Sequence, residues 1–272
     1  MKKIKKGKLM IIATIISLLA VSCKNNTSSV NITGAGATFP QPFYSIVFKK
    51  FYDETHNKVT YGGIGSGGGI NSLKEGVVDF AGSDAYLSDE EMAEIGDVFH
   101  IPTCMGAVVV AYNLPEIQEL NLTGELVAQI FAGEISYWDD EQIQVINEGV
   151  VLPHKKISPV YRSDGSGTTF VFTDYLSKVS EDWKNRFGFG KAVSFPTGIA
   201  AKGNTGIAGV LSQTEGTIGY IGSEYAILSQ KVCKNCLCKD IFFLTFASNF
   251  IIFYVLKSVF TSASLRFITL QS

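Results

Sequence analysis

Three short turns rich in glycine, serine and threonine divide the middle of this chain, and each lies between a predicted strand and a predicted helix. They cover residues 34–40 (GAGATFP), 63–69 (GIGSGGG) and 164–169 (DGSGTT). Apolar runs such as residues 107–112 and 157–161 alternate with amphipathic stretches across residues 31–230. Alternation of this kind predicts an α/β fold with helices on both faces of the sheet.

Capping residues and apolar spacing locate several helices. Pro40 and Pro42 suit a helix start. Four apolar side chains follow them at helical spacing, namely Phe43, Ile46, Val47 and Phe51. Ser88 and Glu91 have the spacing of a capping box, which predicts the start of a short helix.

Two further helices are predicted from capping residues in the second half of the chain. Thr123 precedes an apolar helical stripe and is expected to cap it. Asp139, together with Gln142, is expected to cap a helix that begins after Trp138. A helix over residues 170–176 is predicted to follow the third glycine turn.

The formal charge of −2 is the sum of three segments of different composition. Residues 1–22 carry five lysines and no acid, residues 231–272 carry a net +4, and residues 23–230 therefore carry −11. An acidic middle segment argues against a nucleic-acid partner, because proteins that bind nucleic acid usually carry a basic excess. The content of 46% hydrophobic residues also excludes a disordered chain.

The first 22 residues predict an export signal. The five lysines precede an apolar core over residues 9–21, which is too short to span a bilayer. This core runs into Cys23, and the junction resembles the cleavage box of bacterial lipoproteins, in which Cys23 would be lipidated. An ordinary secretory signal with an incidental Cys23 is the alternative. Residues 23–30 are polar and predict a flexible tether.

The glycine turns have the chemistry of an anion site. A helix N-terminus offers unpaired backbone N–H groups and a partial positive charge, and glycine allows an anion to approach them. Arg162 lies four residues before Ser166, and a guanidinium can grip two oxygens of a tetrahedral anion. Any one turn alone is better explained as an N-cap, but three in one domain favour a shared oxyanion site.

No catalytic constellation accompanies these turns. Residues 63–68 match the pattern G-x-G-x-x-G, but Gly76 breaks the following helix too early for a dinucleotide-binding unit. The chain has no P-loop pattern, and the three histidines show no metal-ligand spacing. We therefore expect no enzymatic activity, no cofactor and no metal. The alternative is a phosphate-ester hydrolase with Ser166 or Ser66 as nucleophile, although neither lies in a nucleophile elbow.

Several sequence strings together resemble the bacterial phosphate-binding proteins, the substrate-binding components of ABC phosphate transporters. They are residues 34–40, 63–66, 78–80 with 83–85, 138–140 and 162–168. The resemblance implies a two-lobed, periplasmic-binding-protein-like α/β fold that closes on one phosphate ion in a cleft. Lobe I would comprise residues 31–106 and lobe II residues 107–230, with a hinge near residues 104–112.

The resemblance also implies the ligands of the ion. They are Thr38, Phe39, Ser66, Asp84, Arg162, Ser166, Gly167 and Thr168. Asp164 matches the acid that orients the arginine. Asp84 can accept a hydrogen bond from phosphate, which carries a proton near neutral pH, whereas sulfate has no proton to donate and would be repelled.

Partners and location follow from the same resemblance. The partners are inorganic phosphate, the membrane permease of an ABC phosphate transporter, and the membrane itself through the lipid anchor. The chain is expected to be a monomer outside the cytoplasm, in the periplasm or at the cell surface, with no nucleic-acid partner.

Residues 231–272 do not continue the resemblance. Cys233, Cys236 and Cys238 precede an apolar run over residues 241–256. We favour the interpretation that the normal reading frame is lost after about residue 230, which would leave lobe I incomplete and makes a non-binding remnant an alternative function. A zinc site, which lacks a fourth ligand in the tail, and a short membrane segment interrupted by polar residues are alternative interpretations of the tail.

Overall fold

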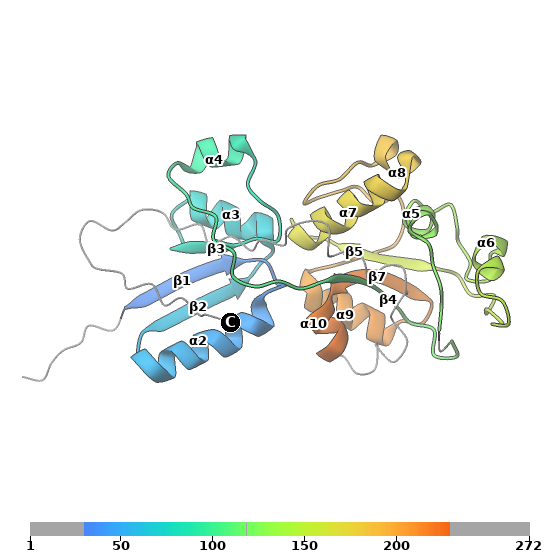
Figure 1. The fold of residues 1–272 in the computed structure, drawn as a ribbon, viewed down its shortest axis with the longest axis horizontal. Helices are drawn as coiled ribbons and strands as arrows, with labels where there is room; N and C mark the ends of the chain where they lie inside the picture. The colour runs from blue at the N-terminus through green and yellow to red at the C-terminus, as the bar shows by residue number, and fades with distance from the viewer. Residues whose placement is uncertain (1–29, 118, 229–272) are drawn as a thin grey trace, which may run out of the picture.

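The computed structural model describes residues 30–117 and 119–228, and these form two lobes that lie side by side (Figure 1). Lobe I consists of β1 (Asn31–Gly36), α2 (Gln41–Thr55), β2 (Lys58–Gly63), α3 (Ser66–Lys74), β3 (Phe80–Gly82) and α4 (Asp89–Ile95). Lobe II consists of β4 (Val108–Tyr112), α5 (Gly124–Phe131), α6 (Glu141–Val145), β5 (Ser158–Arg162), α7 (Gly167–Val179), α8 (Glu181–Arg186), β6 (Ile199–Ala201), α9 (Gly203–Gln213), β7 (Thr217–Gly222) and α10 (Ser223–Leu228). The α/β class is confirmed, and the domain boundaries at residues 106 and 107 stay a prediction.

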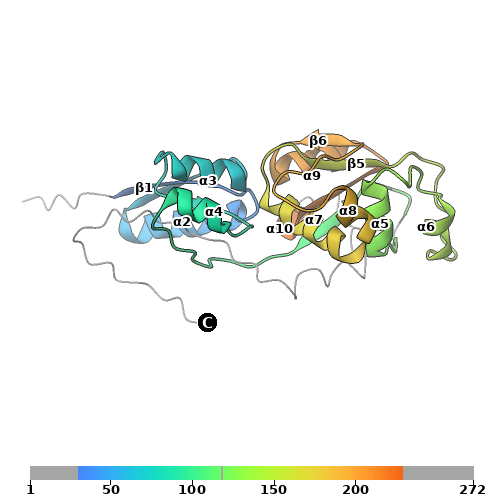
Figure 2. The same ribbon diagram turned by 90° about the horizontal axis from the view of Figure 1, so that it is seen from above.

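Each lobe is a sheet with helices on both faces. The sheet of lobe I has the order β2-β1-β3 and is parallel throughout. The sheet of lobe II has the order β4-β7-β5-β6, in which only the β4–β7 pair is antiparallel. Helices α3 and α2 cover opposite faces of the first sheet, and α7 and α9 opposite faces of the second (Figures 1 and 2). Because parallel strands end at one edge, the turns after β1, β2 and β5 all lie where the lobes meet.

The capping predictions are confirmed with one exception. Ser88 and Glu91 form a reciprocal capping box at the start of α4, and the Thr123 hydroxyl accepts the Leu126 N–H at the start of α5. The predicted Asp139 cap is wrong, because Asp140 is the residue directly before α6 and accepts the Gln142 N–H at 3.0 Å. The Asp139 carboxylate instead turns away to His154 Nδ1, at 2.8 Å.

Helix α2 begins where the prolines predict but packs through a different stripe. Tyr44 is its buried residue, and its ring meets Tyr61 edge-on at 5.0 Å and stacks on Phe48. Two side chains of the predicted stripe, Phe43 and Ile46, are 42% and 71% exposed. The aromatic residues pack because the sheet presents aromatic partners to them, which the spacing within α2 alone does not reveal.

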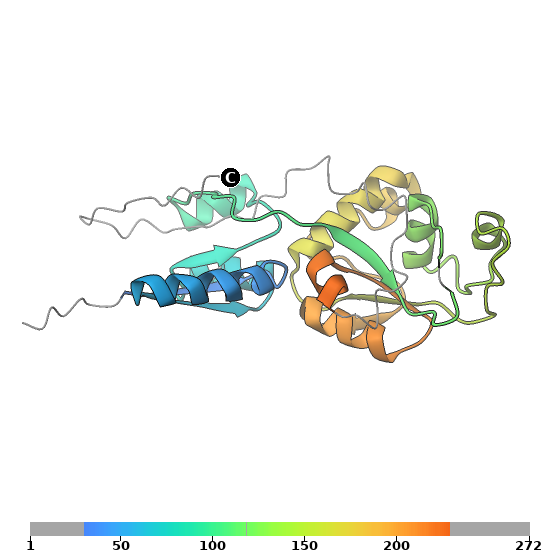
Figure 3. The ribbon, with the colours of Figure 1, turned by 60° about the horizontal axis from the view of Figure 1, so that its bottom comes forward.

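The described chain crosses from lobe I to lobe II once, through residues 96–107, which form neither helix nor strand (Figure 3). The predicted hinge at residues 104–112 overlaps this crossing and β4, and stays a prediction. None of the helices among the described residues is long and apolar enough to cross a membrane. The predicted export signal, Cys23 and the tail lie outside the described residues.

Besides the chain crossing, side-chain contacts join the two lobes beside α4 and α7. Lys191, from the loop between α8 and β6, places its ammonium 2.5 Å from the Glu91 carboxylate on α4. Nearby, the ring of Tyr86 in lobe I meets Phe170 of α7 edge-on at 5.7 Å. The capping box fixes the Glu91 side chain, because its second oxygen accepts the Ser88 N–H at 3.0 Å. The cap of α4 therefore also holds a charge that pairs across the two lobes.

We expect Glu91→Gln to favour separation of the lobes without destabilising lobe I. Glutamine retains the capping box but loses the ion pair, which is partly exposed and contributes up to about 1 kcal/mol. The radius of gyration of the variant chain without added anions, measured by small-angle scattering, should increase, and less so in high salt. Glu94→Gln is the matched control, since Glu94 on the same helix pairs with Lys74 within lobe I. An equal change in both variants would contradict the prediction.

Candidate anion-binding site

The predicted ligands from all three turns and Asp84 meet at the junction of the lobes. The Ser66 hydroxyl oxygen, at the first residue of α3, accepts the Gly167 N–H at 3.0 Å. The Thr168 hydroxyl donates to Asp84 Oδ2 at 3.0 Å, and the Gly67 N–H donates to the Gly165 carbonyl at 2.9 Å. Thr38, Ser66, Ser166 and Thr168 are all buried. The structure therefore brings together residues that lie 84 to 101 positions apart in the sequence.

Arg162, the last residue of β5, is held by Asp164. Its Nε donates to Asp164 Oδ1 at 2.7 Å and its Nη2 to Asp164 Oδ2 at 2.5 Å, which is a bidentate pair. The Gly203 N–H also donates to Asp164 Oδ1, at 3.0 Å. The side chain of Arg162 is 1% exposed, and its Nη1 has no hydrogen-bond partner among the described residues. The buried Nη1 group of the guanidinium thus remains without an acceptor after Arg162 pairs with Asp164.

Burial alone would raise the pKa of Asp164, but the hydrogen bond and charge of Arg162 outweigh it, and the pKa lies below its usual value. Asp164 is therefore ionised at neutral pH. Its role in this geometry is to orient the guanidinium and to balance its charge.

The pKa of Asp84 is shifted in the opposite direction from that of Asp164. Asp84 follows β3 and is 8% exposed, and burial raises its pKa to about 6. The Thr168 hydroxyl and the charge of Arg162 work against this rise, while the nearby Glu224 adds to it. Oxygen Oδ1 of Asp84 is buried and has no hydrogen-bond partner among the described residues. The site thus contains one unused acceptor on a carboxylate beside one unused donor on a guanidinium.

The serine hydroxyls of the second and third turns accept hydrogen bonds from backbone N–H groups. Ser66 Oγ accepts from Gly167 and, at 3.4 Å, from Asp84, whereas Ser166 Oγ caps α7 by accepting the Thr169 N–H at 3.1 Å. A hydroxyl has two lone pairs and one proton. When both lone pairs of Ser66 are used, its proton is left to donate to a ligand.

Two of the predicted ligand groups are used differently in this structure. The Gly167 N–H and the Thr168 hydroxyl donate to lobe I, to Ser66 and Asp84, where the resemblance had directed them at an anion. Phe39 is 1% exposed, with its ring against Gly106 and Gly222. The assignment of all eight residues as phosphate ligands stays a prediction.

Sequence reasoning missed residues that surround the site. Asn204 is fully buried and donates to the Thr38 hydroxyl oxygen, and the partly buried Glu224 lies close enough to raise the pKa of Asp84. A signal for Asn204 was present, since Gly203 and Asn204 open helix α9 directly after strand β6, so that a glycine again stands where a strand passes into a helix. No comparable pattern marks Glu224.

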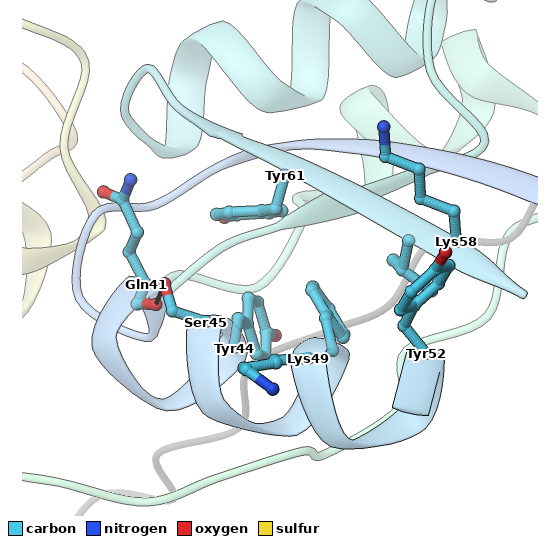
Figure 4. A pocket seen from close by; sticks show the side chains of 9 residues that line it. Gln41, Tyr44, Ser45, Lys49, Tyr52, Lys58 and Tyr61 are labelled. Carbon is cyan, nitrogen blue, oxygen red and sulfur yellow. Dashed lines mark hydrogen bonds between the residues drawn. The ribbon is translucent and has the colours of Figure 1, made fainter. Parts of the chain in front are cut away.

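A separate groove of about 540 Å³ lies between α2 and β2 in lobe I (Figure 4). Its lining includes the rings of Tyr44, Tyr52 and Tyr61 and the lysines Lys49 and Lys58. Lys49 is paired with Asp53 at 2.6 Å. None of the predicted phosphate ligands lines this groove, so it is distinct from the anion site.

Comparison with known proteins agrees with this architecture. The profile of the PBP superfamily domain matches residues 24–263. This chain belongs to the PBP superfamily. The phosphate-binding protein PstS of Xylella fastidiosa (strain 9a5c) is 46% identical over 203 residues, which cover 74% of this chain and 56% of that protein. The chain thus spans little more than half the length of this relative.

Solved structures show the same fold. A substrate-binding protein assigned to a phosphate ABC transporter of Clostridium perfringens, with bound phosphate, superposes with a TM-score of 0.63 over 84% of this chain and 86% of that one. At 17% identity this likeness shows the two-lobed fold alone. A high-affinity periplasmic phosphate-binding protein bound with phosphate, PfluDING, is 25% identical, with a TM-score of 0.58 over 72% of this chain and 57% of that one.

The buried carboxylate of Asp84 predicts a pH-dependent gain of stability in Asp84→Asn. The pKa is about 6 in the folded state, against an ordinary value of 3.8 for an aspartate, so the folded state binds more protons between these values. The free energy of unfolding of the wild type therefore falls as the pH rises through this range, by about 3 kcal/mol. Asparagine carries no charge, so the variant should gain stability over the wild type as the pH rises.

Denaturant unfolding of both chains at pH 4 and pH 7.5, without phosphate, measures this difference. It should be small at pH 4 and favour the variant at pH 7.5. Asp53→Asn, on the exposed side of α2, should shift stability by no more than about 0.5 kcal/mol at either pH. A difference for Asp84→Asn that does not grow with pH would contradict the prediction.

Proposed function

We propose that this chain binds inorganic phosphate between its two lobes and delivers it to the membrane permease of an ABC transporter for import. The observation that carries the proposal is the pair of buried, unused groups on Arg162 and Asp84. Nη1 of Arg162 requires an acceptor, and Oδ1 of Asp84 requires a donor. A protonated oxyanion satisfies both groups at once, because its charged oxygens accept from the guanidinium and its O–H group donates to the carboxylate.

Protonated phosphate fits this requirement and sulfate does not. An anion without a proton would place its oxygen against the unpaired carboxylate oxygen of Asp84, which leaves a buried charge unsatisfied at a cost above about 1–3 kcal/mol. The net −11 of residues 23–230 does not attract anions over long range, so directed hydrogen bonds must hold the ion. The relatives named phosphate-binding proteins support the same ligand.

A binding role is favoured over hydrolysis of a phosphate ester. A serine nucleophile needs a base within hydrogen-bond reach. In the described part of the chain, Ser66 Oγ and Ser166 Oγ accept hydrogen bonds from backbone N–H groups. Neither hydroxyl is bonded to a histidine or carboxylate there. We therefore propose that the chain has no enzymatic activity.

The location and partners form part of the proposal. The basic, apolar N-terminal segment supports export, and Cys23 supports a lipid anchor that holds a monomer at the membrane beside its permease. Closure of the lobes about residues 104–112 would enclose the ion.

Isothermal titration calorimetry of the full chain with phosphate and with sulfate tests the function. We expect a one-to-one complex with phosphate and at least about 100-fold weaker binding of sulfate near pH 8. Heat is a better signal than tryptophan fluorescence, because Trp138 and Trp183 lie buried in the core of lobe II. Equal affinities would contradict the role of Asp84, turnover of a phosphate ester would contradict a pure binding protein, and no heat with either anion would support the non-binding remnant.

The raised pKa of Asp84 predicts that sulfate binding improves in acid. Below about pH 6 the carboxyl is protonated and can donate to sulfate, and above it the protonated fraction falls roughly tenfold per pH unit. Sulfate affinity should therefore fall about tenfold per unit above pH 6 and level off below it. In Asp84→Asn the amide donates at every pH, so sulfate affinity should be independent of pH between 5 and 8. A parallel pH dependence in both chains would refute the assignment.

A further inference from the structure

The buried Asn204, at the second residue of α9, is hydrogen-bonded on every polar group of its side chain. Its backbone N–H and its Nδ2 both donate to the Thr38 hydroxyl oxygen, each at 3.0 Å. Its Oδ1 accepts the Gly222 N–H at 3.1 Å. The Gly222 bond fixes the orientation of the amide, since a flipped side chain would place two donors against each other. Asn204 of lobe II therefore presents donors to a single oxygen of lobe I.

This arrangement determines where the Thr38 proton points. A hydroxyl accepts through two lone pairs, and the two N–H groups of Asn204 occupy both. The remaining O–H cannot point toward Asn204, because donors already fill that side. Thr38 is 3% exposed and belongs to the first glycine turn, and its hydroxyl oxygen lies at the junction of the lobes. Its hydroxyl is thus oriented as a donor whenever the two lobes are in contact.

The first residue of α9, Gly203, supports the guanidinium through Asp164. The Gly203 N–H donates to Asp164 Oδ1, and Asp164 holds Arg162. The Tyr225 hydroxyl, on α10, donates to the Thr38 carbonyl at 2.5 Å and so fixes the backbone of the first glycine turn. The N-terminal end of α9 therefore supports two predicted ligands from different lobes. It contacts Thr38 of lobe I directly and holds Arg162 of lobe II through Asp164.

We propose that Asn204 is a positioning residue for the anion: it sets the Thr38 hydroxyl as a donor to the ion and does so only when the lobes are together. The proposal rests on the proposed phosphate-binding function. It links closure to affinity, because the Thr38 oxygen gains its two N–H partners from lobe II only on closure. Asn204 itself does not contact the ion.

A double-mutant cycle on the full chain tests this role, with phosphate affinity measured by calorimetry. Thr38→Val removes the hydroxyl but keeps the shape of the side chain. If Asn204 acts through that hydroxyl, Asn204→Ala should weaken phosphate binding about tenfold in the wild-type background and less than about twofold in the Thr38→Val background. Thr38→Ser is the matched control, since it retains the hydroxyl and should retain the tenfold effect.

Asn204→Asp separates positioning from simple packing. Aspartate has nearly the same shape and can still accept the Gly222 N–H, so a purely structural role predicts a smaller loss than in Asn204→Ala. Positioning predicts a larger loss, because the carboxylate accepts the Thr38 proton and turns it away from the ion. The excess loss should shrink in the Thr38→Val background, which leaves only the repulsion between carboxylate and anion.

The outcomes distinguish the two levels of the proposal. If the wild-type chain binds no phosphate, the proposed function fails. If the wild type binds and Asn204→Ala weakens binding equally with or without the Thr38 hydroxyl, the positioning role is wrong. Thermal unfolding of each variant identifies chains that do not fold, and if Asn204→Ala is one of them, the cycle is completed with Asn204→Asp, whose equal loss in both backgrounds would overturn the proposal.

Discussion

The site depends on a buried ion pair that does not use all of its hydrogen-bonding capacity. Removing an arginine and an aspartate from water is costly, and the pair between Arg162 and Asp164 is tolerated because it is bidentate and further bonded by Gly203. Two of the guanidinium nitrogens are committed to Asp164, which fixes the plane of the group. The third nitrogen is then directed by the rigidity of the pair, and preorganised donors of this kind bind anions without losing further side-chain freedom.

Two aspartates in one site differ because their surroundings differ. Asp164 lies against a guanidinium that lowers its pKa, whereas burial raises the pKa of Asp84 and Glu224 adds to the rise. One carboxylate is therefore an obligatory anion and the other is close to its titration point. Two environments thus shift the pKa values of two aspartates in opposite directions, and in the proposed function Asp164 orients the arginine whereas Asp84 contacts the ligand. Keeping Asp84 ionised at neutral pH lowers the stability of the fold. This loss is consistent with a site selected for discrimination between protonated phosphate and sulfate.

Much of the local structure could be predicted from the sequence, because it depends on contacts between near neighbours. The capping box of Ser88 and Glu91, the Thr123 cap and the alternation of strands and helices are all local. The Asp139 cap failed because a distant partner, His154, competes for that carboxylate. The stripe on α2 failed for the same reason, since aromatic rings on the sheet decide which face is buried. Asn204 was missed because its role lies in a bond to Thr38, 166 residues away, which no spacing within α9 records.

Glycine is required in the turns for a different reason from the one that the sequence suggests. Close approach of an anion to the backbone was the expected reason for glycine at Gly167. In the structure a Cβ atom there would lie 2.6 Å from the Cβ of Asp84 and 2.7 Å from Ser66 Oγ, both of which belong to lobe I. At Gly65, whose φ is +89°, a Cβ would lie 2.3 Å from Asp164 Oδ2 of lobe II. The glycines are therefore needed for the two lobes to meet backbone to backbone, as in the hydrogen bond from the Gly67 N–H to the Gly165 carbonyl. A side chain at either position would keep Arg162 and Asp84 apart, so contact between the lobes and formation of the site are one structural requirement.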